Sequence, residues 1–146
     1  MTDALNDKPP TSFWIIGVIF LLWNLLGLFA YYTQVTMTPE MMAESFTDAQ
    51  QAWMLNEPAW ATSAYAIAVT AGVIAAALLL MRKALAFPFF ILSFVAVLVQ
   101  DFNAFILSDW QGVWGNSALY LPSVVFILCV VEIWYSWSSK AKGWLT

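Results

Sequence analysis

Polar side chains interrupt a long apolar stretch in the second half of the sequence, "LVQDFNAFIL" at residues 98–107. Gln100, Asp101 and Asn103 lie within four positions of one another, and Asn24 interrupts an earlier apolar stretch. A carboxylate and amides so placed can bind a cation or a proton, or can accept the hydroxyl groups of a small polar solute. Because a charged side chain at bilayer depth costs ~2.5–3.5 kcal/mol, these four residues are candidates for solute or ion binding.

The same groups also have a purely structural interpretation. Interhelical hydrogen bonds in membranes contribute ~0.6 kcal/mol each, and Asp101 would then be protonated or paired. At ~1.5 Å per residue, Asp101 lies ~22–24 Å along its apolar stretch and Asn24 ~17 Å along its own. We therefore expect Asn24 and Asp101 to hydrogen-bond if their two helices are neighbours. The functional and structural interpretations are both open at the level of sequence.

A second carboxylate, Glu132, falls in the last apolar stretch. Counted from residue 137, it lies ~8 Å from the end of that stretch. Arg82 or Lys83 is close enough in the predicted topology to reach it by extending its long side chain, and Arg82 is the candidate partner. The sequence thus predicts an ion pair between Arg82 and Glu132, at a depth from which Glu132 does not join Asn24 and Asp101.

Residues that support enzyme or cofactor chemistry are scarce. The chain has no histidine and a single cysteine, Cys129, which excludes an internal disulfide and removes the usual haem and transition-metal ligands. There is no glycine-rich phosphate loop, and no two carboxylates are predicted at similar depth. We therefore expect no enzyme activity, no cofactor and no metal site.

The elements that position these residues follow from composition, which is 62% hydrophobic and only 10% charged. Membrane-spanning helices need about 20 mostly apolar residues. Four stretches qualify, at residues 13–33, 60–81, 85–107 and 117–137. The sequence therefore predicts an all-α fold, a four-transmembrane-helix bundle that forms a single integral membrane domain over residues 1–146.

The direction of threading is predicted by the basic residues, which favour cytoplasmic loops. All five lie on one side: Lys8, Arg82, Lys83, Lys140 and Lys142. The opposite loops carry only acidic charges. We therefore expect both termini in the cytoplasm.

The long loop at residues 34–59 should contain two short amphipathic helices. Thr38 with Pro39 is typical of a helix start, and Thr47 with Gln50 matches a capping box. This loop has three interpretations: a lid over the helix ends, a gate for a solute, or a surface that binds a partner.

Small residues recur every four positions in the second stretch, at Ala64, Ala68, Gly72 and Ala76. Such a face lets helix backbones approach closely in a membrane. It can pack inside the same bundle, or it can mediate homo-oligomerisation or binding to another membrane subunit.

Several short motifs resemble a known family: "LLWNLLG", "PAW", "LLLMRK" and "KGWLT". In order and spacing they resemble small bacterial four-helix inner-membrane proteins that are often labelled as sugar transporters. The resemblance implies a bacterial inner-membrane location and transport of a small polar solute, and it carries over no catalytic or binding residue. The motifs contain Trp23, Asn24, Gly27, Pro58, Trp60 and Arg82.

The function expected from the sequence is thus an oligomeric component of small-solute transport. The alternative is an accessory subunit of a larger membrane complex that does not itself transport. The expected partners are the lipid bilayer together with either a second copy of the chain or another membrane protein, and no nucleic acid is expected.

Overall fold

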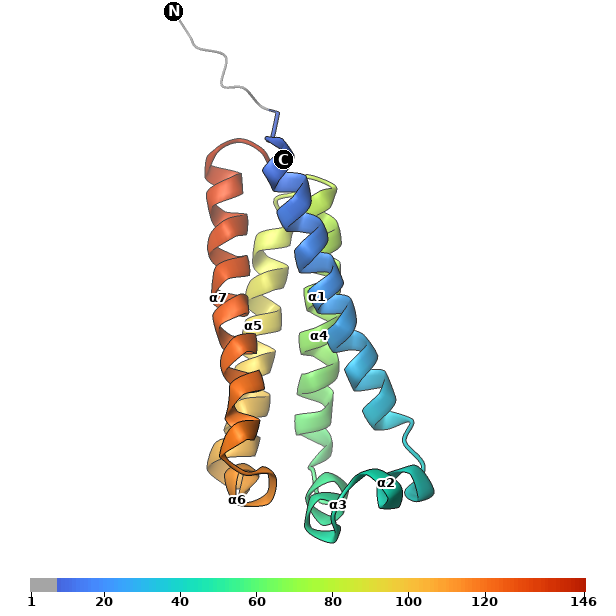
Figure 1. Cartoon of the computed structure of the whole chain (residues 1–146). Coiled ribbons are helices and arrows are strands. Elements are labelled where there is room, and N and C mark those ends of the chain that lie inside the picture. The colour runs from blue at the N-terminus through green and yellow to red at the C-terminus, as the bar shows by residue number, and fades with distance from the viewer. Residues whose placement is uncertain (1–7) are drawn as a thin grey trace, which may run out of the picture.

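Four long helices run side by side along the molecule (Figure 1). The computed structural model describes residues 8–146, so the first seven residues of the predicted domain lie outside the described part. The long helices are α1 (Thr11–Val35), α4 (Ala59–Leu80), α5 (Ala86–Phe102) and α7 (Tyr120–Ala141). A π-helical turn at Asn103–Leu107 extends α5, and a 3-10 turn at Asn116–Leu119 precedes α7. With these two extensions counted, each of the four long helices is long and apolar enough to cross a membrane. The predicted all-α four-helix bundle is confirmed.

The two ends of the bundle differ in what they carry. The end with the start of α1, the C-terminus and the turn between α4 and α5 is called the terminal end here, and the opposite end, with α2, α3 and α6, is called the loop end (Figure 1). All five basic residues of the chain belong to the terminal end, while the loops at the other end are acidic. The charge separation is therefore present in the fold, and the membrane side of each end stays a prediction.

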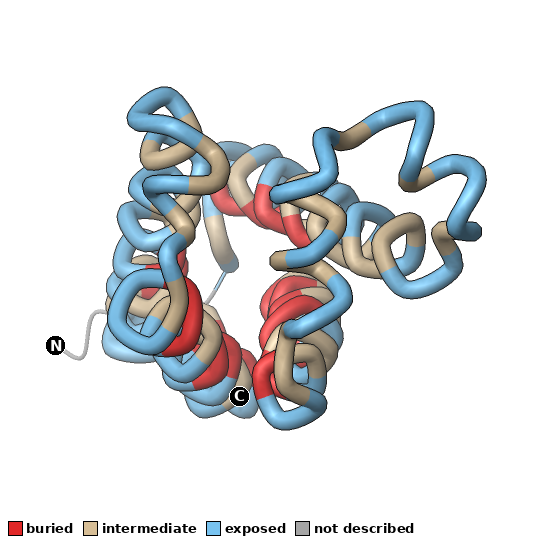
Figure 2. The backbone as a smooth tube through the Cα atoms, turned by 90° about the horizontal axis from the view of Figure 1, so that it is seen from below, coloured by how far each residue is buried: buried red, intermediate tan, exposed pale blue. Residues whose placement is uncertain are grey.

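Helix α4 is central to the packing, because it contacts both α1 and α5, and α5 in turn contacts α7. Its small-residue face, Ala64, Ala68, Gly72 and Ala76, is buried by the other helices of this chain. Figure 2, seen from the loop end, places the buried residues on the sides that the helices turn toward one another. The small-residue face therefore packs inside this bundle, which was one of the roles predicted for it.

The terminal end is closed by an apolar cluster that contains Phe13, Phe20, Leu79, Phe90 and Leu145. The rings of Phe20 on α1 and Phe90 on α5 meet edge to face, with their centroids 6.2 Å apart. Because interdigitating apolar side chains exclude water, this half of the bundle is a packed core.

Two helix ends bring distant motifs together at the terminal end. Helix α4 ends in a Schellman arrangement, in which Lys83 N donates to Leu78 O at 2.8 Å and Arg82 takes a left-handed backbone conformation with φ of 59°. Helix α7 ends in the same way at Gly143, with φ of 74°, and Trp144 N donates to Ser139 O. The chain therefore turns back across the bundle after Gly143.

The last residues then bind the turn between α4 and α5. The Arg82 Nε donates to Trp144 O at 2.8 Å, Thr146 N donates to Arg82 O at 2.8 Å, and Ala84 N donates to Thr146 O at 2.9 Å. Leu145, between them, is buried in the apolar cluster. The motifs "LLLMRK" and "KGWLT" thus form one structural unit at the terminal end.

The loop end contains the two predicted short helices, α2 (Pro39–Ser45) and α3 (Asp48–Leu55). Thr38 caps α2, and Thr47 with Gln50 forms the predicted capping box of α3. A further helix, α6 (Trp110–Trp114), was not predicted. Trp53 of α3 packs edge-on against Trp110, with centroids 5.1 Å apart, and its indole N–H donates to Ser108. The long loop at residues 36–58 therefore packs against the segment between α5 and α7 through Trp53.

Glu57 joins the loop end of α1 to the start of α4. Its Oε2 accepts hydrogen bonds from Thr62 at 3.1 Å and from Gln34 at 3.3 Å. Partial burial raises the pKa of this carboxyl above its ordinary value, and the bond from Thr62 opposes that shift only in part. The folded state therefore binds a proton at Glu57 more tightly than the unfolded chain does.

This shift predicts how stability depends on pH. Because the folded-state pKa of Glu57 is raised, its contribution is fully present below the unfolded pKa and is lost as pH rises through the folded value. We expect Glu57→Gln to raise the melting temperature at neutral pH and to match the parent at mildly acidic pH, measured by thermal unfolding in detergent. The exposed Glu44→Gln is the control. Equal pH profiles for both variants would contradict the prediction.

Candidate functional site

A carboxyl and an amide meet in the middle of the bundle. Asn24 Nδ2 of α1 donates to Glu132 Oε1 of α7 at 2.7 Å and to Phe20 O at 2.9 Å. Glu132 is 2% exposed and Asn24 9%. Hydrogen bonds to charged groups are stronger than neutral ones, and a buried carboxyl without a donor is unfavourable. This contact is the centre of the candidate site.

The prediction that Glu132 lies too near the terminal end to join Asn24 is wrong. Helix α7 continues to Ala141, four residues beyond the predicted end, so Glu132 lies ~14 Å along the helix from that end instead of ~8 Å. Tyr135, one turn closer to the terminal end, stacks against Phe13 and packs edge-on against Phe20. Glu132 is therefore level with Asn24.

The expected contacts of Asn24 with Asp101, and of Arg82 with Glu132, are replaced by others. Helix α4 lies between α1 and α5, so the amide of Asn24 bonds to Glu132 and Phe20 instead of Asp101. The Arg82 side chain is held by the carbonyl of Trp144, because the C-terminal residues fold back over the turn that carries it. Glu132 has Asn24 as its hydrogen-bond partner.

Each of the four long helices contributes to the polar centre. A Cβ built on Gly72 of α4 would collide with Asn24 Oδ1, and it would lie 3.3 Å from Ser93 Oγ of α5. Ser93 is buried and donates to Ala68 O at 2.7 Å. Gly72 was predicted only as a packing residue and Ser93 was not singled out. A serine or glycine in an apolar helix is too common to identify such a site from sequence.

Packing differs between the two halves of the bundle around this centre. Toward the terminal end lies the apolar cluster of Phe13, Phe20 and Leu145. Toward the loop end, every residue of α7 from Tyr120 to Leu128 is exposed or half-buried, and the first buried one is Cys129. The polar centre is thus closed from the terminal end and less densely covered from the loop end.

The remaining predicted residues lie nearer the loop end, on α5. Asp101 is half-buried and lines a groove of about 380 Å³ between α5 and α7, together with Pro122 and Ser123. Gln100 is half-buried and Asn103 is buried at the start of the π-helical turn, where its carbonyl accepts from Ser108. Such turns interrupt regular helices and often occur at functional sites. Because Asp101 lies near the loop end of α5 and Glu132 lies at the polar centre, the two carboxyls occupy different levels of the bundle.

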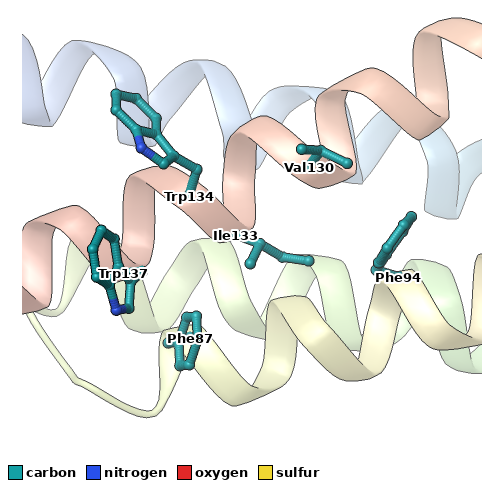
Figure 3. A pocket seen from close by; sticks show the side chains of 6 residues that line it. All are labelled: Phe87, Phe94, Val130, Ile133, Trp134 and Trp137. Carbon is teal, nitrogen blue, oxygen red and sulfur yellow. The ribbon is translucent and has the colours of Figure 1, made fainter.

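A second groove lies on the outside of α5 and α7 near the terminal end, with a volume of about 400 Å³. Figure 3 shows Phe87 and Phe94 extending from α5, and four side chains from α7. Its lining has no ionisable group: Phe87, Phe94, Val130, Ile133, Trp134 and Trp137. This groove belongs to the apolar surface that faces lipid, and it is separate from the candidate site.

The fold and the site define a multi-pass membrane protein of four helices with a carboxyl–amide contact at its centre. Within residues 8–146, no three histidine, cysteine or acidic side chains gather to hold a metal ion. Comparison of the chain with known protein families, with curated proteins and with solved structures finds no match.

Proposed function

We propose that the chain is a component of small-solute transport across a bacterial inner membrane, with both termini in the cytoplasm. The observation that carries this proposal is the hydrogen-bonded pair of Asn24 and Glu132, buried where all four helices meet. Ionisable residues inside a membrane are unfavourable, and they typically belong to substrate, ion or proton pathways. Purely structural helix contacts need no carboxyl.

The asymmetric packing supports the same proposal. A carrier must close its site from one side while it admits solute from the other. Here an apolar cluster with Phe13 and Leu145 covers the terminal side, and the groove beside Asp101 lies between α5 and α7 in the half nearer the loop end. Because four helices enclose little space, we propose that two or more copies form the working unit.

Transport can be tested by solute entry into proteoliposomes. Vesicles with the purified chain are exposed to external glucose, lactose or mannitol, and re-swelling is followed by light scattering. We expect faster re-swelling than in empty vesicles for at least one solute. We expect Glu132→Gln to slow it about tenfold, because the amide keeps an acceptor for Asn24 but replaces the stronger hydrogen bond to a charged group by a neutral one, a difference of ~1–1.5 kcal/mol. Glu44→Gln, an exposed loop residue, should leave the rate unchanged.

An accessory subunit is the competing function, and native mass spectrometry separates the two. Transport by this chain alone predicts homo-oligomers after extraction in a gentle detergent. A stoichiometric foreign subunit, together with re-swelling rates equal to those of empty vesicles, would contradict autonomous transport. The small face of α4 offers the accessory role little support, because its residues are buried within the chain.

A further inference from the structure

The orientation of the Asn24 amide is set by its two hydrogen bonds. Its nitrogen donates both to Phe20 O and to Glu132 Oε1, so the amide oxygen faces Gly72 and Ser93. With the amide flipped, its oxygen would face two acceptors, the carbonyl of Phe20 and the carboxyl. A carboxyl oxygen accepts a hydrogen bond whether or not the other oxygen carries a proton. Asn24 therefore holds Glu132 in place in both of its protonation states.

The titratable neighbours of Glu132 can be named for every helix. Between Lys8 and Tyr31 on α1, and between Tyr65 and Arg82 on α4, the sequence has no titratable residue. Helix α5 offers Asp101, two turns nearer the loop end than Ser93, and α7 itself offers Cys129 and Tyr135. All basic residues belong to the terminal end, where Arg82 binds the carbonyl of Trp144. The hydrogen-bond partner of an ionised Glu132 is therefore the neutral amide of Asn24, which does not cancel its charge. Binding of a proton would remove that charge.

The donors around Glu132 favour a proton over a metal cation. Sodium and other hard cations need several oxygen ligands directed at one point. Here the group directed at the carboxyl is an N–H donor, and the hydroxyl of Ser93 is directed at the carbonyl of Ala68. A proton needs only the free oxygen of the carboxyl.

One face of α5 runs from the level of the Glu132 carboxyl toward the loop end. Ser93, Val97 and Asp101 recur every four positions and so share one face of α5. Val97 and Cys129 of α7 belong to one buried cluster between the two carboxyl levels. Asp101 lies ~12 Å beyond Ser93 along the helix, at the groove between α5 and α7. One apolar layer thus separates the two carboxyls.

We propose that Glu132 is a reversible proton-binding site, supplied from the loop end through Asp101. This inference deepens the proposed transport function, on which it rests, by naming the proton as the coupled ion. Asp101 takes a proton from water at the groove and passes it to the free oxygen of Glu132 through water that transiently enters the apolar layer of Val97 and Cys129. One O–H bond breaks and one forms, Asp101 returns to its carboxylate, and Asn24 keeps its hydrogen bond throughout.

Infrared difference spectroscopy of the full chain in detergent tests the proposal without a solute. We expect the C=O band of a protonated carboxyl to appear and disappear reversibly between mildly acidic and mildly alkaline pH. Glu132→Gln, which preserves shape and an acceptor for Asn24, should lose the band, and Glu44→Gln should retain it. Should Glu132→Gln fail to fold, Glu132→Asp should displace the band. A parent protein without the band, or an unchanged band in the Glu132 variants, would overturn the proposal.

The role of Asp101 has its own readout in the same experiment. Asp101→Asn should keep the band of Glu132 but slow its hydrogen–deuterium exchange severalfold; an unchanged exchange rate would overturn the supply route. Failure of this inference is distinct from failure of the transport function. Solute entry without a titrating band refutes the proton site alone, and a titrating band without solute entry refutes transport alone.

Discussion

Gly72→Ala is expected to lower the free energy of unfolding by about 1–3 kcal/mol, the usual effect of overpacking a core. The new Cβ would collide with the amide oxygen of Asn24 and would lie 3.0 Å from its Cγ. Asn24 cannot move aside without breaking its bonds to Phe20 and Glu132. Solute entry and the infrared band of Glu132 should be lost with it. Thermal unfolding followed by tryptophan fluorescence measures the change in stability.

Two glycines of α1, the helix that faces Gly72 of α4, provide matched controls for this prediction. A Cβ on Gly27 would meet Val69 Cγ1 at 3.5 Å, an ordinary contact, so Gly27→Ala should be neutral. A Cβ on Gly17 would meet the flexible end of Leu80 at 2.6 Å, so Gly17→Ala should fall between the two. Equal melting temperatures for Gly72→Ala and Gly27→Ala would mean that the close approach at the polar centre does not exist.

Leu145→Ala should have the largest effect on stability, about 2–5 kcal/mol, as for other buried leucines. Leu145 is 6% exposed and packs in the cluster with Phe13 and Phe90. Its loss would also weaken the backbone contacts of Thr146 with Arg82 and Ala84. Thermal unfolding again measures the change, and protease cleavage near the C-terminus should become faster.

Leu85→Ala is the matched control at the same end of the bundle. Leu85 is 59% exposed, so its truncation should change stability by less than about 0.5 kcal/mol. Similar effects of the two leucine variants would show that the C-terminal residues do not seal the bundle. A large effect confined to Leu145 would support the closed terminal end on which the transport proposal depends.

Much of the fold follows from local features of the sequence. Long apolar runs specify the four helices, because lipid leaves the backbone no partner but itself. Thr38 with Pro39 and Thr47 with Gln50 specify the short helices, because caps act within a few residues. The fourth helix was predicted to end at residue 137, whereas it continues to Ala141 and is followed by Gly143 with a positive φ.

The candidate site was predicted only in part, and the errors share one cause. Asn24 and Asp101 were identified by their polarity in apolar runs, but their partners depend on which helices are neighbours. A shift of four residues in the end of α7 moved Glu132 by about one turn, and this changed its partner from Arg82 to Asn24. Ser93 and Gly72 acquire their significance only from what they face across the bundle.

The sequence by itself determined the class of protein, the number of helices and the separation of charge between the two ends, because composition and local spacing suffice for these. Only the tertiary structure decided that Asn24 meets Glu132, that the small face of α4 is used within the chain, and that "KGWLT" closes the end beside Arg82. The first and the last of these contacts join residues more than 60 positions apart, and all three depend on the packing of whole helices, which no local pattern encodes.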